Sequence, residues 1–175
     1  NLGHAYFKGE GAPRSEVDAE LWYRRAAEQG DAQAQDMLSW ILAGSEHRAA
    51  DYGQAMAWAA KAAEQGVAAS MTRIGMLYHN ALGVERDTAR AIRWWTTAAR
   101  LGDGDAQAML GAAHHVGQGV PQDSVQAYAW LRRARRNQSK LAENFIYAVR
   151  SSLDEAQIAR AEALADQPLS QEVAP

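Results

Sequence analysis

The chain has 175 residues, which is enough for one domain with its own hydrophobic core or for a short array of repeats. With 47% hydrophobic and 22% charged residues the composition excludes a disordered tail, and no apolar run approaches the length that spans a bilayer. The net charge of -3 argues against a nucleic-acid-binding protein, and the absence of cysteine excludes disulfides, thiolate metal sites and cysteine nucleophiles.

An internal repeat organises the chain. The string AAEQG at residues 26–30 recurs at 62–66, a shift of 36 residues, and AARLG and ARRNQ follow in the same register at 98–102 and 134–138. We therefore expect a truncated repeat at 1–30, complete repeats at 31–66, 67–102 and 103–138, and the start of a fifth at 139–152. Because the first copy lacks its opening six residues, we expect the chain to be a fragment of a longer protein.

Each repeat is expected to fold as two antiparallel helices joined by a tight turn. N-cap residue types open the second helix of successive repeats at Ser15, Asp51, Asp87 and Asp123. Glycines suited to the left-handed conformation end these helices at Gly30, Gly66 and Gly102. The next first helix starts at once, with Asp31 and Asp103 as expected caps. Small residues that allow close approach of the neighbouring helix share one register, at Gly3, Ser39, Gly75 and Gly111.

Two departures from the repeat predict local changes. Residues 45–50 replace the glycine turn of the other repeats and place His47 where the others carry glycine, so this loop must differ. Tyr147 stands in the small-residue register, and we therefore expect the solenoid to end there. A capping helix is expected at 153–166, with Ser152 and Glu155 as its capping box, followed by a flexible tail at 167–175.

The repeat resembles the Sel-like repeat (SLR) family, a relative of the tetratricopeptide repeat. The third repeat matches the family pattern A-x-x-x-L-G-x-x-Y, G-x-G-V-x-x-D and A-x-x-W-Y-x-x-A-A-x-x-G through Ile74, Gly75, Tyr78, Gly83, Val84, Asp87, Ala91, Trp94, Ala98, Ala99 and Gly102. The resemblance covers residues 1–138 and continues into 139–152. It implies an all-α fold, an α/α superhelical solenoid of about four such helix-turn-helix repeats with a capping helix.

The resemblance also implies that the first helices line a concave, partner-binding face. By register, this face carries Phe7, Asp36, Trp40, Thr72, Met76, His79, His115 and Asn144. Tryptophan is a favoured anchor at interfaces, and Trp40 stands off the core register beside the altered loop at 45–50. Two interpretations of Trp40 stay open: an anchor for a partner, or a side chain that covers an apolar gap beneath that loop.

Four other tryptophans share one register of the repeat: Trp22, Trp58, Trp94 and Trp130. We expect them to hold each helix pair together, since solenoids reuse one core position per repeat. Trp95 aligns with other apolar residues and is expected in the core as well.

A basic run at the end of the fourth repeat has two interpretations. Arg132, Arg133, Arg135 and Arg136 occupy the last turns of a helix, where they complement the helix dipole on a solvated face. Alternatively, Arg132, Arg133 and Arg136 form a docking patch for an acidic partner or for anionic headgroups.

No metal site, cofactor or catalytic centre is expected. His79 and His115 share a register on neighbouring repeats, but no carboxylate motif accompanies them. The motifs G-x-S-x-G, G-x-x-x-x-G-K and H-E-x-x-H are missing. So is S-x-x-K, which the β-lactamase activity ascribed to some SLR proteins requires.

These observations predict a non-catalytic scaffold or adaptor that binds a protein partner through the concave face. The Ala- and Arg-rich composition and the resemblance suggest a bacterial cell-envelope, regulatory or toxin-immunity complex, with the periplasm or envelope favoured over the cytoplasm. The alternative is a binder of cell-wall glycan or anionic lipid headgroups, in contact with the wall or membrane surface. Neither nucleic acid nor an integral membrane segment is expected.

Overall fold

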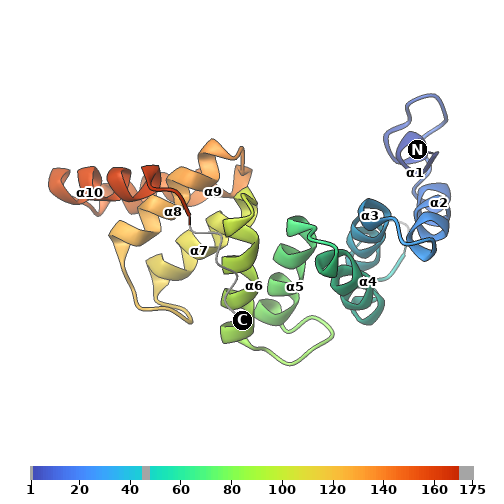
Figure 1. Cartoon of the computed structure of the whole chain (residues 1–175), viewed down its shortest axis with the longest axis horizontal. Coiled ribbons are helices and arrows are strands. Elements are labelled where there is room, and N and C mark those ends of the chain that lie inside the picture. The colour runs from blue at the N-terminus through green and yellow to red at the C-terminus, as the bar shows by residue number, and fades with distance from the viewer. Residues whose placement is uncertain (1, 45–47, 170–175) are drawn as a thin grey trace. The chain divides into compact units, whose positions relative to one another are not determined.

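The computed structural model describes residues 2–44 and 48–169. Within these ranges the chain forms helices and no strand, which confirms the expected all-α class (Figure 1). The helices are α1 (Leu2–Lys8), α2 (Glu16–Glu28), α3 (Ala32–Ala43), α4 (Tyr52–Glu64), α5 (Ala68–Asn80), α6 (Thr88–Arg100), α7 (Gly104–Val116), α8 (Ser124–Arg136), α9 (Lys140–Ser151) and α10 (Glu155–Asp166). His47 and the tail beyond residue 169 lie outside the described residues, so the expectations for them stay predictions.

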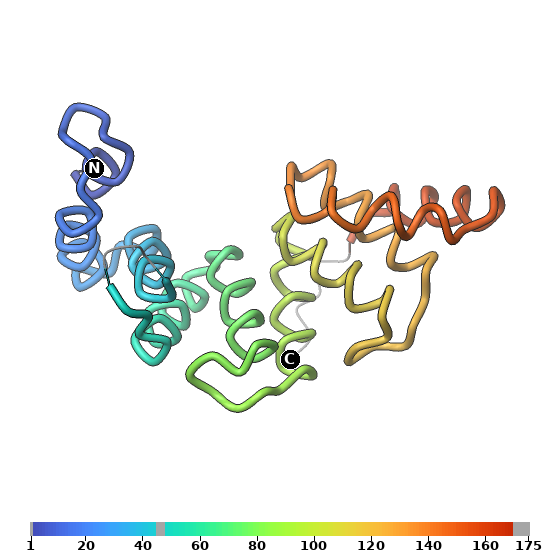
Figure 2. The backbone as a smooth tube through the Cα atoms, turned by 180° about the vertical axis from the view of Figure 1, so that it is seen from behind, coloured from blue at the N-terminus to red at the C-terminus, as the bar shows by residue number. Residues whose placement is uncertain are grey.

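The helices fall into two compact units, residues 1–86 and 87–175. In the first unit, α1 to α5 pack in chain order, each on the next, and α3 also packs on α5. In the second unit, α6 to α9 pack in the same way, α7 also contacts α9, and α10 packs on α8. Figure 2 follows the backbone as it reverses direction between successive helices. This nearest-neighbour packing of helix pairs is that of the predicted α/α solenoid.

Polar side chains cap the helices at the predicted positions. Ser15, Asp51, Asp87 and Asp123 are the N-caps of the second helices, and each accepts a backbone N–H of the first turn. Asp31 and Asp103 cap first helices in the same way. Their Oδ1 atoms accept from the backbone nitrogens of Ala34 and Ala106 at 2.7 and 2.8 Å. Each cap satisfies a donor that has no partner within its own helix.

The cap at Asp51 predicts that stability depends on pH. The backbone N–H of Gln54 holds the pKa of the Asp51 carboxyl below its usual value, and the Gln54 side chain and Arg48 act in the same direction. Because the folded pKa lies below the unfolded one, this stabilisation is present at neutral pH and is lost as the pH falls through the folded pKa. An NMR titration of the Asp51 carboxyl should show the lowered pKa directly.

The matched variant is Asp51→Asn, which keeps a good capping side chain without the titrating charge. We expect its stability to fall less steeply than that of the natural chain as the solution is acidified. An identical acid response in the two proteins would contradict a role for the Asp51 carboxylate.

Left-handed residues end the second helices as predicted. Gly30, Gly66 and Gly102 have φ angles of 91, 86 and 89°, and Gln138 adopts 60° at the corresponding point of the fourth repeat. The small-residue register also has its expected role. A Cβ at Gly111 would stand 2.7 Å from Cγ of Leu131, so only glycine fits where α8 approaches α7.

The interpretation of the register tryptophans as core residues is wrong in part. Trp22, Trp58, Trp94 and Trp130 are only half-buried, although Trp58 does pack against the core of the first unit. The residue after each of them is buried instead, at Tyr23, Ala59, Trp95 and Leu131. Neighbouring residues of a helix point in different directions, so only one of each pair can face the core. The expected burial of Trp95 is confirmed, with 1% of it exposed.

Cations cover the outer faces of three of these half-buried rings. Arg25, Lys61 and Arg133 stand 4.9, 4.1 and 5.0 Å from the ring centroids of Trp22, Trp58 and Trp130. Each cation lies three residues after its tryptophan, the spacing that places two side chains on one helix face. The repeated tryptophan therefore belongs to a partly solvated cation–π pair.

The C-terminal helix forms close to its predicted place but with a different cap. Asp154, not Ser152, is the N-cap of α10, and it forms a capping box with Gln157. Ser152 is instead the C-cap of α9. Ala161 and Ala165 of α10 are buried in one core with residues of α8. Tyr147 of α9 is 68% exposed.

Candidate functional site

An aromatic pair stands on the first helices of the first unit. Phe7 of α1 and Trp40 of α3 meet edge to face, with ring centroids 5.5 Å apart and planes at 90°. Trp40 is 43% exposed, and Phe7 is half-buried. The Lys8 ammonium lies 6.0 Å from the Phe7 ring centroid. Trp40 is therefore a surface residue. Its large apolar side chain lies partly in solvent, beside Phe7 of α1.

The amphipathic pattern of α3 explains why Trp40 faces outward. Leu38, Ile41 and Leu42 are at most 1% exposed and point into the core of the first unit. These three residues occupy the inward face of the helix, so Trp40 is left on the other side.

Two of the predicted partner-binding residues are used by the fold. The Asp36 carboxylate accepts hydrogen bonds from Arg73 Nη1 and from Ser70 Oγ, both at 2.6 Å. Only 13% of the Asp36 side chain and 15% of the Arg73 side chain is exposed. Thr72 is buried, and its hydroxyl donates to the carbonyl oxygen of Ala68 at 3.2 Å. A partner cannot reach Asp36 or Thr72 unless the packing of α3 on α5 changes.

The remaining predicted residues are distributed over both units. Met76 and His79 are half-buried on α5 of the first unit. His115 is half-buried on α7 and Asn144 is exposed on α9, both in the second unit. Of the eight candidate residues, Phe7 and Trp40 contact each other.

The histidines and carboxylates do not assemble into a metal centre within residues 2–44 and 48–169, where no group of three such ligands is found. Burial lowers the pKa of the His79 imidazole, and the positive charge of Arg86 lowers it further. Both effects favour the neutral form of the imidazole.

The basic run on α8 binds the end of α10. Arg133 donates to the carbonyl oxygens of Leu164 and Gln167 at 2.5 and 2.9 Å. Arg136 donates to the Ala165 carbonyl at 3.2 Å and pairs with Asp166 at 2.5 Å. These carbonyls belong to the last turn of α10 and its C-cap residue, at the negative end of the helix, and that of Leu164 also accepts the backbone N–H of Gln167. The arginines thus complement the dipole of another helix.

Arg132 completes this contact through an ion pair with Glu162 at 2.5 Å. Burial lowers the pKa of the Arg133 guanidinium, and the nearby positive charge of Arg136 adds to the effect. The three arginines predicted as a docking patch are therefore committed to holding α10, and they do not form a freely solvated basic surface.

Comparison with known families identifies the chain. The Sel1 repeat matches four times in succession, at residues 1–31, 32–67, 68–103 and 104–139. The chain belongs to the Sel1 repeat family. A search of curated protein sequences found no match.

Solved Sel1 repeat structures agree with this assignment. A Sel1 repeat protein from Oxalobacter formigenes is 33% identical with a TM-score of 0.76, over 94% of this chain and 70% of that one. A protective antigen of uropathogenic Escherichia coli with an SLR fold is 27% identical with a TM-score of 0.57, over 94% of this chain but 43% of that one. Helicobacter pylori cysteine-rich protein B, at 24% identity and a TM-score of 0.57, covers 73% of this chain and 92% of that one, and supports the fold alone.

Sel1 repeat proteins generally mediate protein–protein interactions, and their fold is generally a non-catalytic scaffold. In the part of the chain that the structure describes, no helix is both long and apolar enough to cross a bilayer.

Proposed function

We propose that this Sel1 repeat protein is a non-catalytic adaptor that binds a protein partner through the first-helix surface centred on Phe7 and Trp40. The observation that supports this proposal is the exposed aromatic pair itself. An indole that is 43% exposed leaves apolar surface in water, and covering that surface would be favourable.

The chemistry of this surface suits a polypeptide partner. Aromatic residues are enriched at protein interfaces, and tryptophan is among the residue types that most often dominate binding there. Lys8 provides a neighbouring positive charge beside Phe7. We propose that an apolar side chain of the partner packs against the Trp40 ring, with polar contacts at the edge of the surface.

We also propose that the partner belongs to a bacterial cell-envelope, regulatory or toxin-immunity complex. The bacterial origin of the similar Sel1 repeat structures supports a bacterial setting. Binding to cell-wall glycan or anionic headgroups is less favoured, because the three arginines that would form the basic patch hold α10.

The test is to compare Trp40→Ala with the natural chain. A pull-down from native bacterial lysate first identifies a stoichiometric partner, and calorimetry then measures the affinity of both proteins for it. We expect the affinity to fall about 30-fold, as for a dominant interface tryptophan, with a loss of stability of about 1 kcal/mol or less because 43% of the residue is already exposed.

Leu21→Ala is a matched control, because Leu21 is 46% exposed on α2 of the same unit and lines another hollow, together with Val17, Glu20, Arg24 and Arg48. This variant should bind as the natural chain does. A large loss of stability in Trp40→Ala with unchanged affinity per folded molecule would contradict the proposal. Retention on peptidoglycan or on liposomes without any protein partner would favour the glycan or headgroup alternative.

A further inference from the structure

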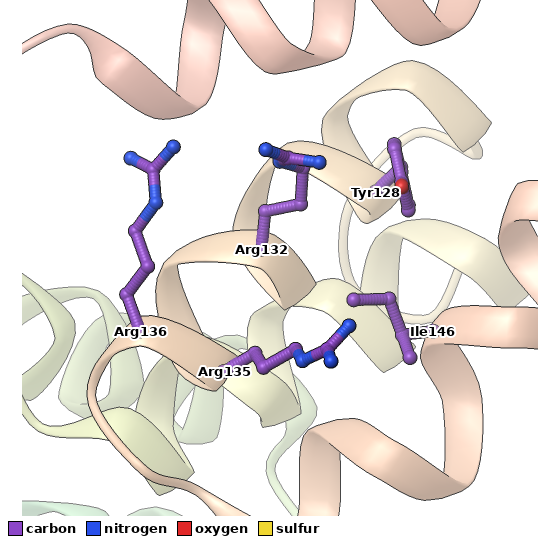
Figure 3. A pocket seen from close by; sticks show the side chains of 5 residues that line it. All are labelled: Tyr128, Arg132, Arg135, Arg136 and Ile146. Carbon is purple, nitrogen blue, oxygen red and sulfur yellow. The ribbon is translucent and has the colours of Figure 1, made fainter.

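A cleft lined by arginines opens on α8 in the second unit. Its volume is about 340 Å³, and its walls are formed by Tyr128, Arg132, Arg135, Arg136 and Ile146 (Figure 3). Arg132 and Arg136 extend toward α10, whereas Arg135 extends in the direction of Ile146 on α9 (Figure 3). The volume lies within the range of small-ligand sites, roughly 300–1,000 Å³.

The charges of this cleft do not balance. Arg132 pairs with Glu162, and Arg136 pairs with Asp166. Arg135 is exposed, and its guanidinium forms no ion pair with the residues that the structure describes. Three cations therefore meet two carboxylates, and the charge of Arg135 is left without a counter-ion at the mouth of the cleft.

The hydrogen-bonding capacity of the cleft is also incomplete. The Nε atom of Arg132 is buried and has no hydrogen-bond partner among the described residues. A guanidinium in this state can still donate to a second carboxylate oxygen if its side chain turns, since Arg binds carboxylates in a two-pronged geometry. A ligand that brings a carboxylate would satisfy Arg135 first and could reach Arg132 next.

The other walls are apolar. Tyr128 and Ile146 are 3% and 4% exposed, and the Arg132 guanidinium lies 5.9 Å from the Tyr128 ring centroid. These two residues form a largely buried apolar floor beside the cations, with only a small area open to a ligand. A cleft with this composition suits a ligand in which a carboxylate group stands next to an apolar side chain.

We propose that this cleft binds an acidic peptide segment, with Arg135 contacting its carboxylate and Tyr128 and Ile146 contacting a neighbouring apolar side chain. The inference concerns the second unit and is independent of the surface around Phe7 and Trp40. A membrane is less suited to this site, because attraction to anionic lipid takes a cluster of about four to eight unpaired cations. Here the arginines other than Arg135 are held by α10.

The test uses the whole chain and a fluorescein-labelled peptide in which glutamate alternates with leucine and phenylalanine. Fluorescence anisotropy should show saturable binding to the natural chain. Arg135→Ala should weaken binding about tenfold, as expected for the loss of one charge-assisted hydrogen bond. Its thermal stability should change little, because Arg135 is exposed and its guanidinium forms no ion pair with the described residues.

Arg93→Ala is the matched control, since Arg93 is an exposed arginine on α6 of the same unit and lies outside the cleft. This variant removes the same charge and should bind the peptide as the natural chain does. An equal loss in both variants would overturn the proposal in favour of non-specific attraction. So would equal binding of the peptide with glutamine in place of glutamate, or the absence of saturable binding.

Vesicles containing phosphatidylglycerol distinguish the membrane from the peptide. We expect vesicle binding, if any, to be insensitive to Arg135→Ala. Binding to vesicles that depends on Arg135, without binding to the acidic peptide, would assign the cleft to lipid headgroups and overturn the proposal.

Discussion

Replacing Trp95 with alanine is expected to lower the free energy of unfolding by about 3–5 kcal/mol, the range for truncating a buried large aromatic side chain. Trp95 lies on α6, and it is the largest fully buried side chain among the described residues. The space of an indole cannot be refilled by small movements of its neighbours, so a cavity remains in the second unit. Urea unfolding followed by circular dichroism measures the loss.

Trp94→Ala provides the control on the same turn of the same helix. Trp94 is half-buried, and its truncation should cost about 1 kcal/mol, in the middle of the range for ordinary substitutions. Equal losses in the two variants would show that both rings share the core, and would contradict the assignment of the core to Trp95 alone.

The repeat period could not distinguish these two tryptophans. A period identifies equivalent positions, and the constant tryptophan at Trp22, Trp58, Trp94 and Trp130 is its clearest feature. The core position one residue later varies in size instead, from alanine to tryptophan. It can vary because the facing helix compensates: Gly3 makes room for Tyr23, and Gly111 makes room for Leu131. Core packing is non-local, so the most regular residue was not the most buried one.

The local features of the fold were predictable because local hydrogen bonds determine them. The caps at Asp31, Asp51 and Asp103 and the left-handed Gly30 and Gly66 follow from residue type alone. The capping box of α10 was misplaced because two N-cap residue types, Ser152 and Asp154, stand two residues apart. In the structure Asp154 caps the helix, and Gln157 returns a hydrogen bond to its backbone N–H.

The contact of α10 with α8 has a signature in the sequence. Arg132 and Arg136 are four residues apart, and so are Glu162 and Asp166, so that each pair lies on one helix face. Two matching pairs of opposite charge predict that the helices run side by side, as the ion pairs show. The repeat register relates these arginines to their own helix and says nothing about a second helix that packs against them.

The candidate surface was predictable in its position but not in its composition. Register placed Phe7 and Trp40 on the first helices, and the structure brings them into contact. Register also placed Asp36 on that surface, but it could not show that Ser70 and Arg73 of the following repeat approach its carboxylate. The exposure of a side chain at a given repeat position depends on which side chains the next repeat places against it. Ser70 and Arg73 cover Asp36, whereas Trp40 stays 43% exposed.

Asp36→Ala is therefore expected to lower the free energy of unfolding by about 3 kcal/mol, because it leaves the charge of Arg73 largely buried without a partner. The double variant Asp36→Ala with Arg73→Met removes both charges and keeps apolar bulk between α3 and α5. It should recover part of the loss, and the resulting double-mutant cycle measures the coupling of the pair.

Partner affinity separates this structural role from a binding role. Measured per folded molecule, the affinity of Asp36→Ala for the partner should equal that of the natural chain, because the carboxylate faces Ser70 and Arg73 and not solvent. Trp40→Ala should show the opposite pattern, with lost affinity and retained stability. If Asp36→Ala were as stable as the natural chain but failed to bind, the ion pair would contribute nothing to folding. Asp36 would then belong to the partner-binding surface together with Trp40.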